Sequence, residues 1–473
     1  MAFSRRITTT LTCPAGTRSD EIPNVTRPPG RVRRWVGRAS EPVDASSLVF
    51  FRVAFGLLLF AATVRFAAHG WIREHYLEPR YFFPFWGLDF AKPLPGPWMY
   101  VVFAVMGASA LGVAFGAAYR ASALTLGLSF TYVHAIDKTY YLNHYYLVSV
   151  LAVLCVLLPL HRAGSVDAWR RGAPFATAEL PAWVLWLLRF QIGIVYFFGG
   201  VAKLGVDWLV HAQPLTIWLS RNRDVFLIGP LLGYKTTAYA MSWAGLLFDL
   251  STPFLLSWRR TRIPAYGAVL LFHLVTARLF QLGMFPYFMS AFALIFLPPA
   301  FFHRFFSRWL PSNAGLTQAA LRVPRWLLPW ALFQLLFPLR ALLYPGSALW
   351  TEEGYRFSWN VMLSEKNGYI EVTARDRSTG ESFDVAPLDY LTLQQARQMS
   401  AQPDMIQQFA HIVRDDFAAR GRDVGVFVQA DVSLNGRPSA PLVDPTVDLA
   451  AERDTLLPKQ WLRPLPRQLR PRF

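Results

Sequence analysis

Long apolar stretches alternate with short polar segments over most of the chain, up to about Tyr344. A helix that crosses the hydrocarbon core of a bilayer needs roughly 20 consecutive apolar residues, and these stretches reach or approach that length. They begin near Leu48, Trp98, Ala121, His144, Trp183, Thr237, Pro264, Met284 and Trp326. The pattern predicts an α-helical polytopic membrane domain with about nine transmembrane helices.

From about Trp350 onward, the pattern changes to that of a small soluble α+β domain. In "FSWNVMLSEKNGYIEVTARD", two strand-like stretches flank Asn367-Gly368, a pair typical of hairpin turns. The segment "TLQQARQMSAQPDMIQQFAHIVRDDFAARG" predicts helix with an interruption at Pro403. Apolar and polar residues alternate again in "VGVFVQADVSLNG", which predicts a further strand. We therefore divide the chain into an N-terminal arm (1–47), a membrane domain (48–345) and a soluble domain (346–473).

The positions of the arginine clusters predict how the chain crosses the membrane. They lie in the N-terminal arm and in "HRAGSVDAWRRG", "SWRRTR" and "FHRFFSR", after the fourth, sixth and eighth apolar stretches. Cytoplasmic loops carry an excess of Lys and Arg, so these segments are expected on the cytoplasmic side with the N-terminus. An odd number of spans then places the soluble domain on the external side.

Composition agrees with a membrane protein and narrows the choice of partners. Hydrophobic residues make up 53% of the 473 residues and charged residues only 16%, which is unusual for a soluble domain. The net charge of +17 could indicate nucleic-acid binding, but the basic residues lie in short clusters between apolar stretches and in the tails. We therefore expect membrane lipid and no nucleic acid as a partner. The Arg-, Pro-, Thr- and Ser-rich arm predicts a disordered basic segment near anionic headgroups.

Lys203 is the most unusual residue of the apolar stretches. In "GIVYFFGGVAKLGVDW" it is the only charge between Gln191 and Asp207. Burial disfavours the charged form of an ammonium group, so a lysine facing an apolar cavity can be a neutral amine that accepts a proton from a phenol-like ligand. The alternative is that Lys203 extends to the headgroups beside Asp207.

Further polar residues are predicted to collect near the external surface, on the same side as Lys203. His144 and Asn143 could donate hydrogen bonds to the oxyanion that deprotonation of a ligand creates, and Arg278 could hold a carboxylate. The candidate catalytic residues are Lys203 and His144. The candidate ligand-binding residues are Asn143, Asp137, Tyr141, His273, Arg278 and Gln281.

Structural roles remain open for several of these residues. Asp137 and Lys138 could pair with each other or with Arg278, and His144 could be an interfacial histidine with its hydrogen bonds satisfied. His273 could bond a neighbouring carbonyl oxygen. No cluster of His and Cys with metal-ligand spacing occurs in the sequence, so we expect no metal.

Six stretches of the chain resemble, in this order, the vitamin K-dependent gamma-glutamyl carboxylase family and its bacterial relatives, which have an HTTM-type membrane domain. They are "IDKTYYLNHYYL", "YFFGGVAKLGVDW", "FDLSTPFLL", "LFQLGMFPYF", "WTEEGYRFSWNVML" and "VDPTVDL". The resemblance covers both the membrane and the soluble parts.

The resemblance implies a membrane enzyme that couples epoxidation of reduced vitamin K by O2 to carboxylation of glutamate side chains with CO2. Lys203 in "GGVAKL" matches the family's base, and Asn143 and His144 in "LNHYY" match its active-site asparagine and histidine. Asp137 belongs to the family's Asp-Lys-Thr triplet, for which we expect a positioning role. The implied cofactor is phylloquinol or menaquinol, without a metal. The implied partners are a lipophilic quinol, a peptide or protein glutamate and an epoxide-recycling reductase, and the implied location is a bacterial inner membrane.

Two other functions stay open from the sequence. One is a quinol oxygenase, or a carboxylase of a small molecule or lipid, which incorporation of CO2 into peptide would distinguish. The other is a transporter or lipid-binding protein, because ionisable residues within membranes also mark solvated paths. Paired broken helices in corresponding halves of the chain would favour transport, and we find none in the sequence.

Overall fold

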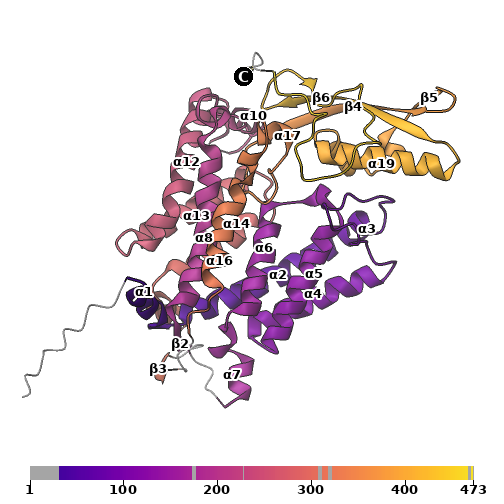
Figure 1. Cartoon of the computed structure of the whole chain (residues 1–473). Coiled ribbons are helices and arrows are strands. Elements are labelled where there is room, and N and C mark those ends of the chain that lie inside the picture. The colour runs from indigo at the N-terminus through magenta and orange to yellow at the C-terminus, as the bar shows by residue number, and fades with distance from the viewer. Residues whose placement is uncertain are drawn as a thin grey trace, which may run out of the picture.

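A body of helices carries a separate α+β unit across one end. In Figure 1, the helices coloured from indigo to orange form the body, and the yellow C-terminal unit lies across their upper end. The computed structural model describes residues 31–172, 177–226, 228–306, 312–317, 322–466 and 470–471.

Each of the apolar stretches predicted above contains a helix. These are α2 (Ser46–Ala68), α4 (Trp98–Phe115), α5 (Tyr119–Ile136), α6 (Asn143–Leu157), α8 (Ala182–Val201), α12 (Lys235–Ser257), α13 (Arg262–Leu279), α14 (Phe285–Ala293) and α16 (Leu327–Leu336). Among the described helices, three are long and apolar enough to cross a membrane: Ser46–Ala68, Trp98–Phe115 and Ala182–Leu204. The count of about nine spans therefore stays a prediction. The other helices are shorter or include polar residues, such as Asp249 in α12 and Arg278 in α13.

Two groups of helices pack through close approaches at glycines. Helix α2 packs against α4, α4 against α5 and α5 against α6, while α8 packs against α12 and α12 against α13. At the crossing of α2 and α4, a Cβ on Gly56 would collide with the carbonyl oxygen of Ala110. At the crossing of α8 and α12, a Cβ on Gly200 would lie 2.7 Å from Leu250 Cγ. Helix α14 contacts both α2 and α13, so it joins the two groups.

Shorter elements connect these helices. The α-helices are α3 (Trp71–Tyr76), α7 (Val166–Arg170), α9 (Val206–Leu209), α10 (Leu215–Ser220), α11 (Gly229–Leu232) and α15 (Pro299–Phe306). The 3-10 helices are η1 (Lys138–Tyr140), η2 (Leu160–Arg162), η3 (Ala202–Leu204), η4 (Leu294–Phe296), η5 (Phe337–Leu343) and η6 (Pro387–Asp389).

The end of the N-terminal arm differs from our expectation of disorder over residues 1–47. Residues 1–30 lie outside the described part of the chain, but α1 (Arg31–Ser40) and β1 (Pro42–Asp44) follow them. Strand β1 pairs antiparallel with β2 (Thr177–Pro181), which pairs parallel with β3 (Ser312–Thr317). Pairing with a segment far along the chain orders this part of the arm, and a local composition argument does not detect such pairing.

The C-terminal unit has the predicted α+β architecture. After α17 (Ala348–Thr351), it comprises β4 (Lys366–Asp376), β5 (Ser382–Asp384), α18 (Leu393–Met399), α19 (Pro403–Ala419), β6 (Val424–Leu434) and β7 (Ala440–Pro441). The strands form an antiparallel sheet in the order β5-β4-β6-β7, and α19 packs against β6. The break between the helices at Pro403 and the strand after Asp423 are confirmed.

The hairpin predicted at Asn367-Gly368 is wrong. Both residues lie inside β4, where they pair with Ser433 and Val432 of β6. Glycine is required at position 368 because a Cβ there would collide with the carbonyl oxygen of Ser400. The preceding residues form an irregular linker, in which Phe357, Trp359 and Met362 have positive φ angles of 61°, 59° and 57°. This linker reaches the helices and forms part of the candidate site.

Candidate functional site

The transition from α8 to η3 places Lys203 in the interior. Helix α8 is apolar and mostly buried, and it tightens into η3 at Ala202 before Gly205 ends the helical segment. Only 5% of Lys203 is exposed. Lys203 therefore does not extend to the surface beside Asp207, which was the alternative left open by the sequence.

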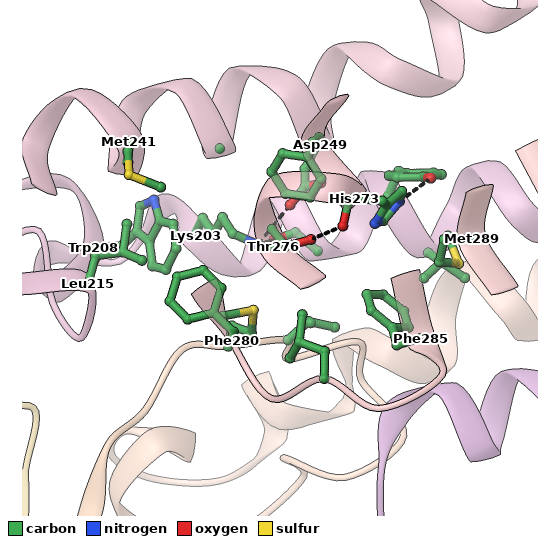
Figure 2. A pocket seen from close by; sticks show the side chains of 18 residues that line it. Lys203, Trp208, Leu215, Met241, Asp249, His273, Thr276, Phe280, Phe285 and Met289 are labelled. Atoms are coloured by element: carbon green, nitrogen blue, oxygen red, sulfur yellow. Dashed lines mark hydrogen bonds and ion pairs between the residues drawn. The ribbon is translucent and has the colours of Figure 1, made fainter. Parts of the chain in front are cut away.

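Asp249 of α12 is the charged partner of Lys203. Figure 2 shows the two side chains meeting, and Lys203 Nζ donates to Asp249 Oδ2 over 2.7 Å and to the carbonyl oxygen of Gly199 over 3.0 Å. Nζ also lies 5.1 Å from the centre of the Trp208 ring. Sequence reasoning missed Asp249, although a carboxylate within the apolar stretch "GLLFDLSTPFLL" was a detectable signal for a buried charge pair. Lys203 thus lacks the purely apolar surroundings that we expected.

The pair lies at a small, mainly apolar cavity of about 80 Å³. Its lining includes aromatic and sulfur-containing side chains together with the polar side chains of Tyr196, His273 and Thr276 (Figure 2). Val361 and Met362 of the linker complete the wall. The cavity is therefore formed jointly by the helices and by the segment that leads into the α+β unit.

A larger cavity of about 640 Å³ adjoins the first. Four residues line both cavities: Leu282, Phe285, Val361 and Met362. The larger cavity also includes Asn143, His144 and Gln281 in its lining. The structure thus brings the two candidate catalytic residues to neighbouring cavities that share a wall, with Lys203 in the smaller one and His144 in the larger one.

His144 is buried near the start of α6, and its ring packs among aromatic rings. The ring centres of Tyr145 and Phe285 lie 4.6 and 5.7 Å from that of His144. Within the described parts of the chain, no protein group forms a hydrogen bond with its ring nitrogens. The histidine therefore has hydrogen-bonding capacity for a ligand, in contrast to the satisfied interfacial histidine considered above.

His273 lies in the lining of the smaller cavity and has one protein partner. Its Nε2 is 2.9 Å from the hydroxyl oxygen of Tyr196, which also lines that cavity. Its Nδ1 has no partner among the described residues. His273 is therefore bonded to a side chain, whereas the sequence suggested a carbonyl oxygen.

Three of the predicted ligand-binding residues contact the linker or the α+β unit. Asn143 Nδ2 donates to the carbonyl oxygen of Asn360 over 2.8 Å, and the Tyr141 hydroxyl accepts from the backbone N–H of Phe357 over 2.7 Å. Asp137 Oδ2 accepts from Gln395 Nε2 over 2.8 Å. Asn143 also belongs to the larger cavity, while Asp137 and Tyr141 line neither cavity.

Lys138 pairs with the α+β unit and not with Asp137. Its Nζ lies 2.8 Å from Asp404 Oδ2, and Arg356 Nη1 donates to the same oxygen over 2.7 Å. Burial favours the neutral form of Asp404, but the two cations outweigh it and hold the pKa of that carboxyl far below its ordinary value. Burial lowers the pKa of Lys138 against the opposing effect of Asp404. These residues thus fasten the helical body to the α+β unit.

Arg278 and Gln281 lie near each other in sequence but differ in position. Gln281 belongs to the lining of the larger cavity. Arg278, at the end of α13, is exposed and belongs to the lining of neither cavity. Among the described residues, no three His, Cys, Asp or Glu side chains are grouped so that they could hold a metal ion.

These features define a class of protein: a helical membrane protein with a buried lysine–carboxylate pair at an apolar cavity, joined to an α+β unit by a linker that completes the cavity wall. Comparison with known families gives the particular family. The model of the HTTM domain matches residues 40–301, and the model described as the vitamin K-dependent gamma-carboxylase, lumenal domain matches residues 322–468. The chain belongs to the vitamin K-dependent gamma-carboxylase family. No solved structure matches the chain.

Membership confirms the resemblance inferred from the sequence and supports a carboxylase-like membrane enzyme. The family implies a requirement for reduced vitamin K, which is a lipophilic quinol, and a glutamate-containing substrate. Lys203, Asp249 and His144 lie within the HTTM match, and the linker residues Val361 and Met362 lie within the lumenal-domain match. The two cavities are thus built from both matched domains.

Proposed function

We propose that the protein oxidises a reduced vitamin K-type quinol with O2 at the cavity of Lys203, and that this reaction drives carboxylation of glutamate side chains with CO2. The buried pair of Lys203 and Asp249, facing an apolar cavity, is the observation that carries the proposal. When bound, the quinol supplies electrons and, on oxidation, a base stronger than any side chain of the protein.

The residues of the two cavities fit such a lipophilic ligand. Pockets for small organic ligands are commonly roughly 300–1,000 Å³ and mostly apolar, with a few polar groups that orient the ligand. The larger cavity, about 640 Å³, falls in this range and has an aromatic lining. Both cavities also offer polar groups, with Asn143 and His144 at the larger one and the pair of Lys203 and Asp249 at the smaller one. Leu282 and Phe285, which line both, would contact a ligand that reaches from one to the other.

Lys203 and Asp249 would accept the hydroxyl proton of the quinol as a unit. Protons of two closely coupled groups belong to the pair and not to either group alone. Asp249 and the Trp208 ring both stabilise positive charge on Lys203, so an ammonium group formed there is compensated. An uncompensated buried ammonium would be strongly unfavourable, which gives the carboxylate a definite role.

His144 would stabilise negative charge on the ligand. Its ring has no protein hydrogen-bond partner among the described residues, and it borders the larger cavity. A donor placed in advance within apolar surroundings stabilises a developing oxyanion more strongly than water would. His273 and Tyr196 provide further hydrogen-bonding groups at the smaller cavity.

The test is epoxide formation by purified protein in nanodiscs supplied with reduced vitamin K and O2. Lys203→Ala should lower the rate by about 100-fold or more, as removal of a general base does. Lys235→Ala is the matched control, because Lys235 is an exposed lysine at the start of α12, and it should retain the wild-type rate.

A second variant separates the loss of the base from a folding defect. Lys203→Ala leaves Asp249 buried without its partner, so the double variant Lys203→Ala/Asp249→Asn removes that charge as well. A folded single or double variant with wild-type epoxide formation would remove the role proposed for Lys203.

A further inference from the structure

The α+β unit makes a direct polar contact with the segment that carries Lys203. Asp207 belongs to α9, four residues after Lys203, and Arg437 follows the end of β6. Arg437 Nη1 donates to Asp207 Oδ2 over 2.7 Å, and Nη2 donates to Oδ1. The two side chains are only 11% and 13% exposed, so this fork-like ion pair is largely shielded from water.

Asn435 makes the contact more rigid. Its Nδ2 donates to Asp207 Oδ2 over 2.8 Å, and its Oδ1 accepts from the backbone N–H of Glu365 over 2.8 Å. Asn435 is completely buried and has a positive φ angle of 51°, a conformation that asparagine tolerates better than most residues. Asp207 is therefore held by a tight turn of the α+β unit.

Trp208, the residue after Asp207, connects this contact to the candidate site. Trp208 Nε1 donates to the carbonyl oxygen of Ser242 over 2.8 Å, and Ser242 Oγ donates to the carbonyl oxygen of Trp208 over 2.6 Å. The ring of Trp208 lines the smaller cavity next to Lys203, as Figure 2 shows. Fixing α9 thus also fixes one wall of the cavity.

We infer that Asp207, Arg437 and Asn435 are positioning residues, through which the α+β unit holds Trp208 and Lys203 in the geometry needed for proton transfer. This inference rests on the proposed role of Lys203. It adds a function for the α+β unit at the quinol half of the reaction, in addition to any contact with a glutamate-containing substrate.

Chemical reactivity of Lys203 tests the positioning without any turnover. Reductive methylation of the full-length protein in nanodiscs, followed by mass spectrometry, gives the rate of Lys203 modification relative to exposed Lys235. Arg437→Ala should raise the Lys203 rate by about tenfold, because α9 loses its fork-like contact and water gains access. Arg437→Lys keeps the charge but not the fork, and it should give an intermediate rate.

Arg377→Ala is the matched control. Arg377 forms ion pairs with Asp423 and Asp448 in the α+β unit, and neither partner lines the two cavities described above. The Arg377→Ala variant should leave the rate of Lys203 modification at the wild-type value. A folded Arg437→Ala protein with wild-type Lys203 reactivity would overturn the inference, as would equal increases in both variants.

Kinetics separate the inference from the proposed function. For a wild-type protein that forms epoxide, Arg437→Ala should lower kcat by about 10- to 100-fold with KM for the quinol within about threefold, because misplaced groups slow the chemical step. If only KM rises, the positioning role is wrong although the proposed function stands. If Lys203→Ala forms epoxide at the wild-type rate, the role proposed for Lys203 is wrong and the inference fails with it. If the folded wild-type protein forms no epoxide, the proposed function itself is wrong.

Discussion

At the scale of single residues, polar side chains in apolar surroundings define the candidate site. Lys203 has a carboxylate, a carbonyl oxygen and an indole ring around its ammonium group, while the ring of His144 packs against the rings of Tyr145 and Phe285 and borders the larger cavity. This difference suits different roles. The surroundings of Lys203 stabilise a proton that it has accepted, whereas those of His144 leave its ring available to donate a hydrogen bond to a ligand.

The role of His144 predicts a specific kinetic change. His144→Ala should lower kcat for epoxide formation by about 10- to 100-fold while KM for the quinol changes by less than about threefold, because an interaction stronger in the transition state mainly affects kcat. His144→Gln retains an N–H donor and should recover part of the loss. Steady-state kinetics at several quinol concentrations give both constants. A rise in KM with unchanged kcat would instead make His144 a wall residue.

The sequence reveals these residues to different degrees. Lys203 stands out because it is the only charge in a long apolar stretch, and its burial could be anticipated. Its pairing with Asp249 could not, because the two residues are 46 positions apart on different helices and only packing brings them together. Val361 and Met362 line both of the adjoining cavities that contain Lys203 and His144, and they come from a linker that local patterns do not locate.

At the scale of elements, the crossing of α8 and α12 determines the geometry of the lysine–aspartate pair. Gly200 precedes Lys203 by three positions and contacts α12 at Leu250, next to Asp249. Because no side chain separates the helices at this point, their backbones approach closely. Any side chain at position 200 must move the helices apart or displace Leu250.

Gly200→Ala should therefore impair both stability and activity. The added Cβ would lie 2.7 Å from Leu250 Cγ and 2.8 Å from its backbone nitrogen, and overpacking of this kind costs about 1–3 kcal/mol. Gly205→Ala is the matched control, because a Cβ at Gly205 meets no atom within 4 Å and φ there is −71°. Thermal unfolding and epoxide formation in nanodiscs measure both effects. Equal values for the two variants would contradict the importance of this crossing.

Hydrophobic patterns locate the helices well because burial in lipid or protein imposes the same apolar requirement over many residues. Local turn signals are less dependable. The Asn367-Gly368 pair is a hairpin signal by itself, but β4 and β6 pair along eleven residues each, and this long pairing outweighs the local preference. The ordering of β1 likewise comes from pairing with β2, which no property of the arm predicts.

At the scale of the whole molecule, buried and half-buried charges join the helical body to the α+β unit. Lys138 contacts Asp404, and Asp207 contacts Arg437. Hydrogen bonds from Arg437 and Asn435 outweigh burial and hold the pKa of Asp207 below its ordinary value. The pKa of Asp404 is likewise lowered, so both carboxylates are charged in the folded protein.

This arrangement predicts that acid weakens the contact between the two parts. A carboxylate with a lowered pKa in the folded state stabilises the protein above the ordinary Asp pKa of about 3.9, and the contribution is lost as the pH falls through the lowered pKa. In thermal unfolding from pH 7 to pH 3, Asp404→Asn should be less stable than the wild type at pH 7. The difference should shrink below about pH 4. A difference that stays constant with pH would contradict the role of Asp404.

The orientation of the molecule in the membrane is a further prediction at this scale. The arginine clusters predict a cytoplasmic N-terminus and an external α+β unit. Ser378→Cys in a Cys13→Ser background places a thiol in an exposed turn after β4, while Cys155 is buried. A membrane-impermeant maleimide should label this thiol in intact cells. Labelling only from the cytoplasmic side would contradict the predicted topology.

The most direct test of the account measures both products of the coupled reaction at once. Wild-type protein and Lys203→Ala in nanodiscs receive reduced vitamin K, O2, labelled bicarbonate and a short glutamate peptide, and epoxide and peptide-bound label are quantified separately. The account predicts both products from the wild type and the loss of both in Lys203→Ala. The account would be contradicted if folded wild-type protein formed neither product. It would also be contradicted if Lys203→Ala formed both products at wild-type rates.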